Sequence, residues 1–250
     1  MSDEIVIAIL AKDKAHILAY YLQCILDQTY PKNKLHLYIR TNDNNDSTAK
    51  VLQDFIDTYG SEYASIKFDA SSIDESIKEY AQHDWNSKRF SILGKIRQES
   101  VEYANRLGAN YFVADCDNFI TADTLSQLYS MKSLGVIAPL IKSTSNYSNY
   151  HYAVTDSGYY EENALYYTIL YTTMQGIFKV AVVHCTYFIA ADLLHHVCYS
   201  DGSGRHEYVI FSDTLRKKNI PQYIDNRHDY GTLTFAVTHE EFLKETIHRV

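Results

Sequence analysis

The composition of this 250-residue chain is that of an ordinary globular protein, with 46% hydrophobic and 22% charged residues. Asp and Glu outnumber Lys and Arg by 31 to 23, for a net charge of −8, which disfavours nucleic acid or an anionic membrane as a partner because both bind basic surfaces. No apolar run has membrane-spanning length, and the four cysteines lack CxxC spacing, so we expect buried free thiols.

Strand-like and helical patterns alternate through the first half of the chain. The strand patterns are short apolar runs, and the helical patterns repeat apolar residues at three- and four-residue spacing. The predicted strands cover residues 4–10, 34–40, 65–70 and 111–114, and the predicted helices cover 13–27, 46–56 and 90–107. Strands that alternate with helices form βαβ units, so we predict an α/β fold with a mixed, mainly parallel sheet flanked by helices.

The pattern changes in the second half. The predicted elements there are a strand at 135–141, a hairpin at 149–160, a strand at 179–184 and a helix at about 207–218. Residues 71–88, which include Trp85, are predicted to be irregular and polar. Because the sequence has no linker or repeat, we predict one domain of residues 1–250, with a nucleotide-binding half at 1–120 and an acceptor half at 121–250.

Two aspartates follow the predicted fourth strand. Asp115 and Asp117 are separated by one residue, so a continuing strand would place both side chains on one face. Two carboxylates so close repel each other unless a cation lies between them, and the end of a strand is where open α/β sheets bind ligands. The pair indicates a Mg²⁺ or Mn²⁺ site that also takes substrate phosphates; a solvated acidic turn is the alternative.

Eight segments carry more specific motifs, among them "YIRTNDNNDST", "YFVADCDNFIT" and "YIDNRHDYG". They cover residues 9–25, 38–48, 83–98, 111–121, 136–141, 147–160, 182–189 and 223–231. In order and spacing they resemble the collagen β-galactosyltransferases, glycosyltransferase family 25. The resemblance implies a GT-A fold, a bound divalent cation (typically Mn²⁺), a UDP-sugar donor, and transfer of galactose to hydroxylysine of a collagen-like polypeptide.

The resemblance also assigns residues to the donor site. Asp117 would be a direct metal ligand and Asp115 a contact to the ribose or the metal. The metal would bind the donor diphosphate and stabilise the negative charge on the departing UDP. Leu10, Ala11 and Lys12, at the end of the first strand, would pack against the uridine, although a solvated Lys12 is equally compatible with the sequence.

Asp43 follows the second strand, where a carboxylate commonly contacts the base or ribose of a nucleotide. We expect it to contact the uracil or ribose. The alternative is that Asp43 caps the next helix, a role that Asp46 or Ser47 could fill instead.

Arg97 falls on the apolar stripe of the predicted helix 90–107, so it points inward, where an unpaired charge is costly. The donor diphosphate or sugar would be its partner, and the alternative is a salt bridge to a buried carboxylate such as Asp115. Lys95 lies off the stripe and is expected in solvent.

An inverting transfer needs a carboxylate that takes the proton of the acceptor hydroxyl. Glu207 is the candidate base; the family carries two aspartates where this chain has His206 and Glu207. An ordinary glutamate at a helix N-terminus is the alternative, and Asp213 or Asp229 would be the next candidates.

A third metal ligand would come from "NRHDYG", as either His228 or Asp229. The family carries a histidine at the position of Asp229, so the two residues look exchanged here. His184 would line the acceptor side of the site, or it is a hydrogen-bonded core histidine.

The sequence leaves several functions open. UDP-glucose could replace UDP-galactose, a glycan could replace collagen, and the domain could bind a UDP-sugar or collagen without turnover. A dehalogenase-type phosphatase is disfavoured because Phe119 stands where that chemistry needs Thr or Val. Glycans on the sequons at Asn45 and Asn146 would crowd the expected site, which favours a cytoplasmic location over the endoplasmic reticulum lumen.

Overall fold

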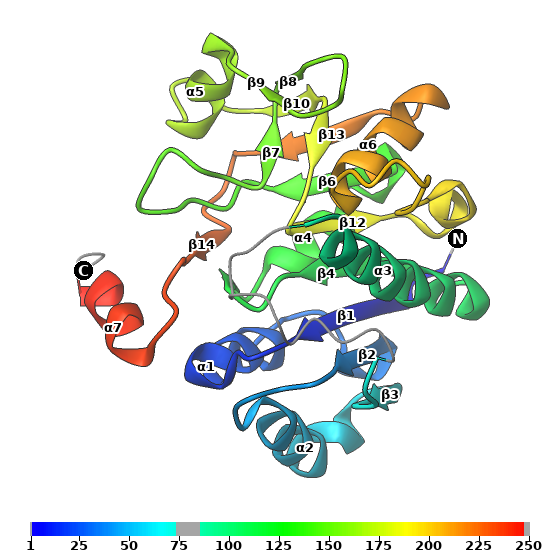
Figure 1. Ribbon diagram of the computed structural model, residues 1–250, viewed down its shortest axis with the longest axis vertical. Coiled ribbons are helices and arrows are strands. Elements are labelled where there is room, and N and C mark those ends of the chain that lie inside the picture. Colours follow the sequence, from blue (N-terminus) through cyan, green and yellow to red (C-terminus); the bar gives the residue numbers. More distant parts are fainter. Residues whose placement is uncertain (1, 74–85, 248–250) are drawn as a thin grey trace.

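The computed structural model describes residues 2–73 and 86–247. An eight-stranded sheet forms its centre (Figure 1), in the order β10–β13–β6–β12–β4–β1–β2–β3. These strands are β1 (Ile5–Ala11), β2 (Leu35–Thr41), β3 (Ser65–Asp69), β4 (Asn110–Ala114), β6 (Val136–Pro139), β10 (Ile177–Val180), β12 (Thr186–Ile189) and β13 (Gln222–Asp225). The first four strands are parallel, as predicted, whereas β12 runs antiparallel to β4 and β6 and β10 runs antiparallel to β13.

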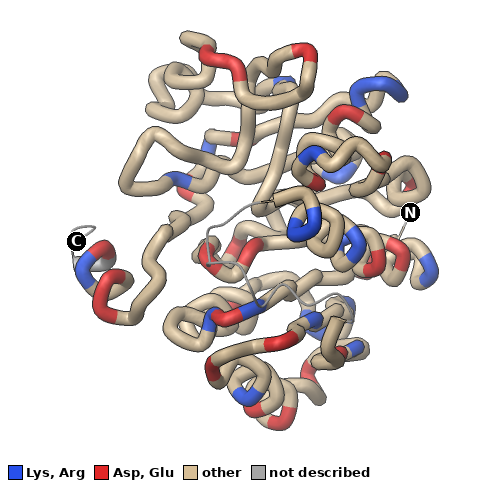
Figure 2. Tube along the Cα trace, viewed as in Figure 1, with Lys and Arg blue, Asp and Glu red and all other residues tan. Residues whose placement is uncertain are grey.

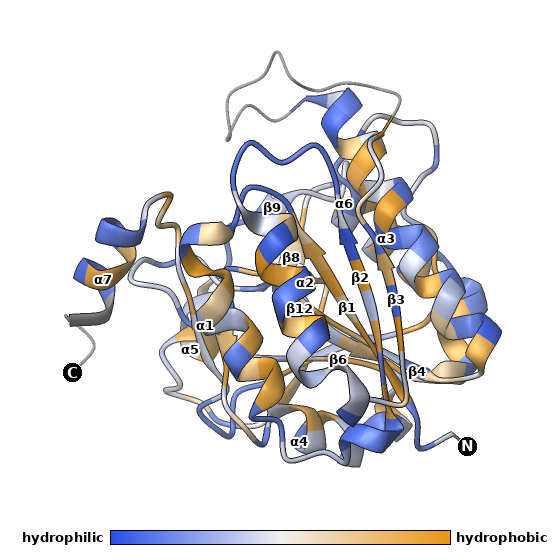
Figure 3. Ribbon diagram, turned by 90° about the horizontal axis from the view of Figure 1, so that it is seen from below, coloured by the Kyte–Doolittle hydropathy of each residue, from blue (hydrophilic) through white to orange (hydrophobic). Residues whose placement is uncertain are grey.

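Helices cover both faces of the sheet, as predicted (Figure 3). The side chains of β1 alternate between two cores: Ile5, Ile7 and Ile9 join one, and Val6 and Ala8 join the other. The first core includes α1 (Ala15–Leu26), α2 (Thr48–Tyr59) and α4 (Thr124–Ser130), and the second includes α3 (Ser87–Leu107), α5 (Ala164–Leu170) and α6 (Glu207–Lys217). A last helix, α7 (His239–Ile247), packs against α1. In the described part of the chain, no helix combines the length and apolarity needed to cross a membrane.

The structure differs from the prediction at several elements of the second half. The predicted strand 179–184 divides at Ala181, so that β10 joins the main sheet and β11 (Val182–Val183) pairs with β7 (Tyr150–His151). The side chains of Arg216 and Gln222 donate to the carbonyl of Ala181 at 2.7 and 3.1 Å. This carbonyl group therefore has hydrogen-bond partners at the point where the two strands separate. The prediction missed β12, and the predicted hairpin is confirmed only for β8 (Ala153–Val154) and β9 (Tyr160–Glu161).

The remaining expectations on local structure are mostly confirmed. Helix α3 ends at Gly108, which has φ of +63° as a left-handed cap requires, and Lys95 is exposed. All four cysteines are free, but only Cys116 is fully buried. Trp85 and much of the predicted irregular segment 71–88 lie outside the described residues.

A short ladder brings the C-terminal part of the chain to the end of β4. Strand β14 (Gly231–Leu233) pairs antiparallel with β5 (Asn118–Ile120), and Gly231 lies opposite Ile120. Beyond the ladder, the amide of Thr234 donates to the carbonyl of Asp117 at 3.0 Å. This pairing requires a glycine, because Gly231 has φ of +120° and a Cβ atom there would overlap the carbonyl oxygen of Phe119.

We expect Gly231→Ala to lower the free energy of unfolding by more than 3 kcal/mol, because about 1–3 kcal/mol of backbone strain adds to the overlap with Phe119. Urea denaturation measures the change. Gly108→Ala is the matched control: its φ is also positive, but no atom lies within 4 Å of the added Cβ, so it should cost only about 1–2 kcal/mol. Equal losses for the two variants would show that β14 moves away from β5 without cost.

Candidate active site

The two predicted carboxylates lie at the carboxyl end of β4, the middle of the sheet. The strand ends where the amide of Asp115 donates to the carbonyl of Cys185 at 2.9 Å, and the amide of Asn118 then closes a turn onto the carbonyl of Asp115 at 2.9 Å. Asp115 and Asp117 therefore stand on a turn and not on a continued strand. On this turn the two side chains contact different residues, Asp115 contacting Arg97 and Asp117 contacting Lys14.

Asp115 is held by a buried arginine. The Arg97 guanidinium donates from Nη2 to Asp115 Oδ1 at 2.7 Å, and its Nε lies 3.4 Å from Glu207 Oε1. Arg97 and Glu207 are each only 5% exposed. The inward direction predicted for Arg97 is confirmed, and its partner in the structure is the carboxylate Asp115 that the sequence offered as the alternative.

This trio is not fully satisfied by hydrogen bonds. Among the described residues, no hydrogen-bond partner exists for three buried atoms, Arg97 Nε and Nη1 and Glu207 Oε2, although Nε keeps its ion-pair contact with Glu207 Oε1. Burial raises the pKa of Glu207 above its ordinary value, although the charge of Arg97 pulls it down. Burial likewise raises the pKa of Asp115, against the opposing charge of Arg97. Such groups are commonly found where a ligand or a proton transfer completes the network.

Asp117 has a different counter-ion, Lys14, which the sequence analysis did not single out. Lys14 Nζ lies 3.0 Å from Asp117 Oδ2. Figure 2 shows the charged residues at the start of α1 beside the acidic turn after β4. Burial lowers the pKa of Lys14, but the charge and hydrogen bond of Asp117 outweigh it and leave the pKa raised. The one available signal was the position of Lys14 just after the end of β1.

The residues predicted to contact uridine lie together at the ends of β1 and β2. Lys12 is not freely solvated, since its Nζ donates to the carbonyl of Asp43 at 2.9 Å. Asp43 does not cap α2: its Oδ2 accepts from the amide of Ile73 at 3.1 Å, while Asp46 accepts from the amide of Thr48 at 2.9 Å. The carbonyl of Leu10 accepts from the Cys116 thiol at 3.5 Å.

Ala11, also expected at the uridine, is buried at the end of β1. It lies two residues before Asp13, whose Oδ1 accepts from the amide of Asn45 at 2.6 Å. The loops after β1 and β2 are thus hydrogen-bonded to each other. Residues of both loops would have to lie close together to contact the same nucleotide.

His228 and Asp229 are not brought to the carboxylate turn. Strand β14 runs antiparallel to β5, and Thr234 lies at the end of β5 that is next to Asp117. His228 and Asp229 precede β14 and therefore lie beyond the other end of β5, near Ile120. There the hydroxyl of Thr121 donates to the carbonyl of Asp229 at 3.3 Å. Both side chains are exposed, and within the described ranges no three His, Cys, Asp or Glu residues form a metal-binding group.

The aspartate pair nevertheless suits part of a metal shell. Carboxylate oxygens are the ligands that Mg²⁺ and Mn²⁺ prefer, and both ions commonly take their other ligands from phosphates and water. The hydrogen bonds to Arg97 and Lys14 use one oxygen of each carboxylate, Oδ1 of Asp115 and Oδ2 of Asp117. The donor set fits a cation that binds together with a diphosphate, and not a site made entirely of protein ligands.

Aromatic rings and a histidine lie next to the turn. The ring of Tyr147 lies 5.6 Å from that of His184 and 5.2 Å from that of Phe235, and Tyr208 lies 5.1 Å from His184. His184 is buried, and burial holds its pKa well below the ordinary value, so the ring is neutral. Its Nδ1 faces Cys185 Sγ at 2.9 Å, but its Nε2 has no partner among the described residues, so it is only half satisfied as a core histidine.

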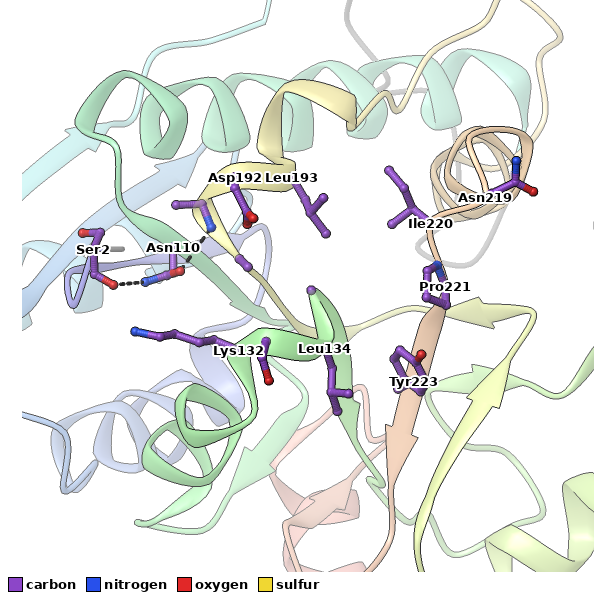
Figure 4. A pocket seen from close by; sticks show the side chains of 14 residues that line it. Ser2, Asn110, Lys132, Leu134, Asp192, Leu193, Asn219, Ile220, Pro221 and Tyr223 are labelled. Carbon is purple, nitrogen blue, oxygen red and sulfur yellow. Dashed lines mark hydrogen bonds between the residues drawn. The ribbon is translucent and has the colours of Figure 1, made fainter.

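A cavity of about 630 Å³ lies away from this site, at the other end of the strands (Figure 4). Asn110, the first residue of β4, lies in its wall and binds the carbonyl of Ser2 and the amide of Ala191, both at 3.1 Å. We place the chemistry at the carboxylates, because the charged and unpartnered groups gather there.

Comparison with known proteins identifies the relatives of this chain. The model of the N-terminal domain of glycosyltransferase family 25 matches residues 2–250. Mouse inactive glycosyltransferase 25 family member 3 is 28% identical over 96% of this chain and 42% of its own length. Human procollagen galactosyltransferase 2 is 27% identical over 98% of this chain and 41% of its own length. The chain thus spans about two fifths of these relatives.

Solved structures support the fold. S. aureus TarS 1–349 in complex with UDP-GlcNAc aligns with a TM-score of 0.59 and 14% identity, over 93% of this chain and 59% of its own. The mannosyltransferase PcManGT from Pyrobaculum calidifontis, in complex with GDP-Man and Mn²⁺, aligns with a TM-score of 0.54 and 13% identity, over 94% of this chain and 55% of its own. The predicted GT-A fold is confirmed, and the chain belongs to glycosyltransferase family 25.

Proposed function

We propose that this chain is the donor-binding and catalytic domain of a metal-dependent hexosyltransferase. It would move galactose, or glucose, from a UDP-sugar to an acceptor hydroxyl with inversion, and hydroxylysine of a collagen-like polypeptide is the proposed acceptor. One observation carries the proposal: Asp115 at the end of β4 and the buried Glu207 share the guanidinium of Arg97. The procollagen galactosyltransferase among the relatives supports the acceptor, and TarS with UDP-GlcNAc supports the type of donor.

The proposed chemistry divides among a few side chains. Asp115 and Asp117 would hold Mn²⁺ or Mg²⁺, which supplies positive charge at the diphosphate as UDP departs. Arg97 keeps Asp115 in place and adds a fixed positive charge to the site. Glu207 would accept the acceptor's proton at Oε2, the oxygen without a partner among the described residues.

A catalytically silent domain is the alternative, and the inactive family member 3 among the relatives favours it. The two functions differ in turnover. UDP release should be measured from UDP-galactose and UDP-glucose with Mn²⁺, with and without a hydroxylysine peptide. Peptide-dependent release supports the transferase and ranks the two donors; UDP-sugar binding without release supports the silent domain.

We expect Asp117→Asn to abolish transfer and Mn²⁺-dependent UDP binding, because the neutral amide is a poor ligand for a hard cation. The fold should be intact, since the side chain of Asp117 is a third exposed. Calorimetry of UDP with Mn²⁺ or with EDTA measures the binding, and circular dichroism checks the fold. Asp123→Asn, at an exposed aspartate past the other end of β5, is the control. Full activity of the wild-type protein in EDTA would contradict the proposed metal dependence.

A further inference from the structure

Each carboxylate at the end of β4 already has a cation of the chain beside it. Arg97 lies 2.7 Å from Asp115, and Lys14 lies 3.0 Å from Asp117. Counted with Glu207, which lies against the same Arg97, the site has three carboxylates and two cations, so most of its negative charge is already offset. A divalent cation arriving at the free protein meets the positive charge of Lys14 directly at one of its proposed ligands.

The two counter-ions differ in how firmly they are held. The Arg97 side chain is only 6% exposed, and it also lies against Glu207. Removing it from Asp115 would leave charges buried and unpaired. The Lys14–Asp117 pair is partly in water, with side chains 23% and 33% exposed, and such pairs contribute little to stability. Lys14 can be displaced at small cost, whereas Arg97 cannot.

The backbone around Lys14 is fixed, so that only its side chain needs to move. The amide of Lys14 donates to the Thr48 hydroxyl at 2.7 Å, and the amide of Ala15 donates to Asp46 at 2.9 Å. These bonds hold the start of α1 against the start of α2. The ammonium is thus presented to Asp117 from a rigid anchor on a flexible four-carbon stem.

Building on the proposed donor site, we propose that Lys14 is a displaceable counter-ion of Asp117 that couples the binding of metal to that of nucleotide. In the free protein Lys14 occupies the carboxylate and weakens divalent cation binding. When a nucleoside diphosphate binds, its negative charge offers the ammonium a new partner and the cation new ligands. The cation and the nucleotide consequently bind tightly only together.

Electron paramagnetic resonance of Mn²⁺ tests this coupling without any turnover. Free Mn²⁺ is titrated with wild type and with Lys14→Met, each with and without UDP. For wild type we expect weak binding alone and tighter binding with UDP. For Lys14→Met we expect Mn²⁺ alone to bind about tenfold more tightly and UDP to add correspondingly less, within the usual range of such couplings.

Lys50→Met is the control, because it removes the same charge from an exposed lysine on the neighbouring helix α2, where its partner is Asp54 and not a carboxylate of the donor site. Equal Mn²⁺ affinities for wild type and Lys14→Met, or equal gains in the two lysine variants, would overturn the role of Lys14. Failure of Mn²⁺ to bind wild type even with UDP would instead overturn the metal site itself. Asp117→Asn checks that the bound ion occupies this site.

Discussion

Replacement of Glu207 by glutamine is expected to lower transfer by about 10²–10⁴-fold, the usual contribution of a general base. Glutamine keeps the shape of the side chain but cannot take a proton from the acceptor. UDP affinity should stay unchanged, because Glu207 reaches the donor carboxylates only through Arg97. Initial rates of peptide-dependent UDP release measure the loss, and calorimetry measures UDP binding.

The pH dependence gives the same prediction an independent readout. Glu207 acts as a base only when it is ionised, and burial raises its pKa above the ordinary value of 4.5. The wild-type rate should therefore fall as the pH is lowered through that raised pKa. The Glu207→Gln variant should lose the part of this fall that comes from Glu207 and keep the part that comes from Asp115, whose pKa burial also raises.

Asp213→Asn is the control for the base. Asp213 lies on the same helix, but its carboxylate is bound by Arg205 and Lys217, each at 3.0 Å. We expect the transfer rate of the Asp213→Asn variant to match that of wild type. A normal rate for Glu207→Gln would show that Glu207 is not the base and is only a residue of the helix N-terminus. A lowered rate for Asp213→Asn would instead point to Asp213, the next candidate named from the sequence.

Arg97→Met is expected to lower the free energy of unfolding by about 3–5 kcal/mol, the range found when one member of a buried ion pair is removed. Methionine fills much of the same space, but Asp115 and Glu207 would then stay buried with no compensating charge beside them. That loss is a large share of the 5–15 kcal/mol typical of a domain. Urea denaturation measures it.

Two comparisons identify the electrostatic origin of the effect. Arg97→Met/Glu207→Gln should recover part of the loss, because one of the two orphaned charges is gone. The penalty of Arg97→Met should also shrink at acidic pH, where protonation removes the charges of Asp115 and Glu207. A loss below about 1 kcal/mol, or one that is independent of pH, would mean that Arg97 acts by packing alone.

The sequence was most informative where a residue's direction follows from local periodicity. The helical spacing of α3 placed Arg97 inward, and the apolar run before Asp115 placed the carboxylates at the end of β4. The predicted burial of Arg97 restricted its partners to an anion, so that the sequence offered two candidates, the donor diphosphate or sugar and, as the alternative, Asp115. Glu207 came from the family resemblance, since nothing in its local pattern separates a base from an ordinary helix-start glutamate.

Long-range register was not accessible in the same way. Which residue of the last segment faces Asp117 depends on how β14 aligns with β5, and a shift of a few residues would exchange Thr234 for another. The proposal of His228 or Asp229 as a metal ligand needs a different alignment from the one in the structure. Lys14 was missed for a related reason, because it belongs to no periodic pattern and its partner lies 103 residues away.

The contact between Thr234 and the turn at Asp117 also limits how the protein can be made. The donor-side carboxylates are synthesised long before the strand that lies against their turn, because β14 lies far along the chain from Asp117. Until then, the turn lacks β14 and α1 lacks the helix α7 that packs on it. Contacts across such distances form slowly because a long loop must close first. The donor site is consequently completed only after β14 has been synthesised, and a nascent chain that stops before β14 is not yet able to bind substrate in the native manner.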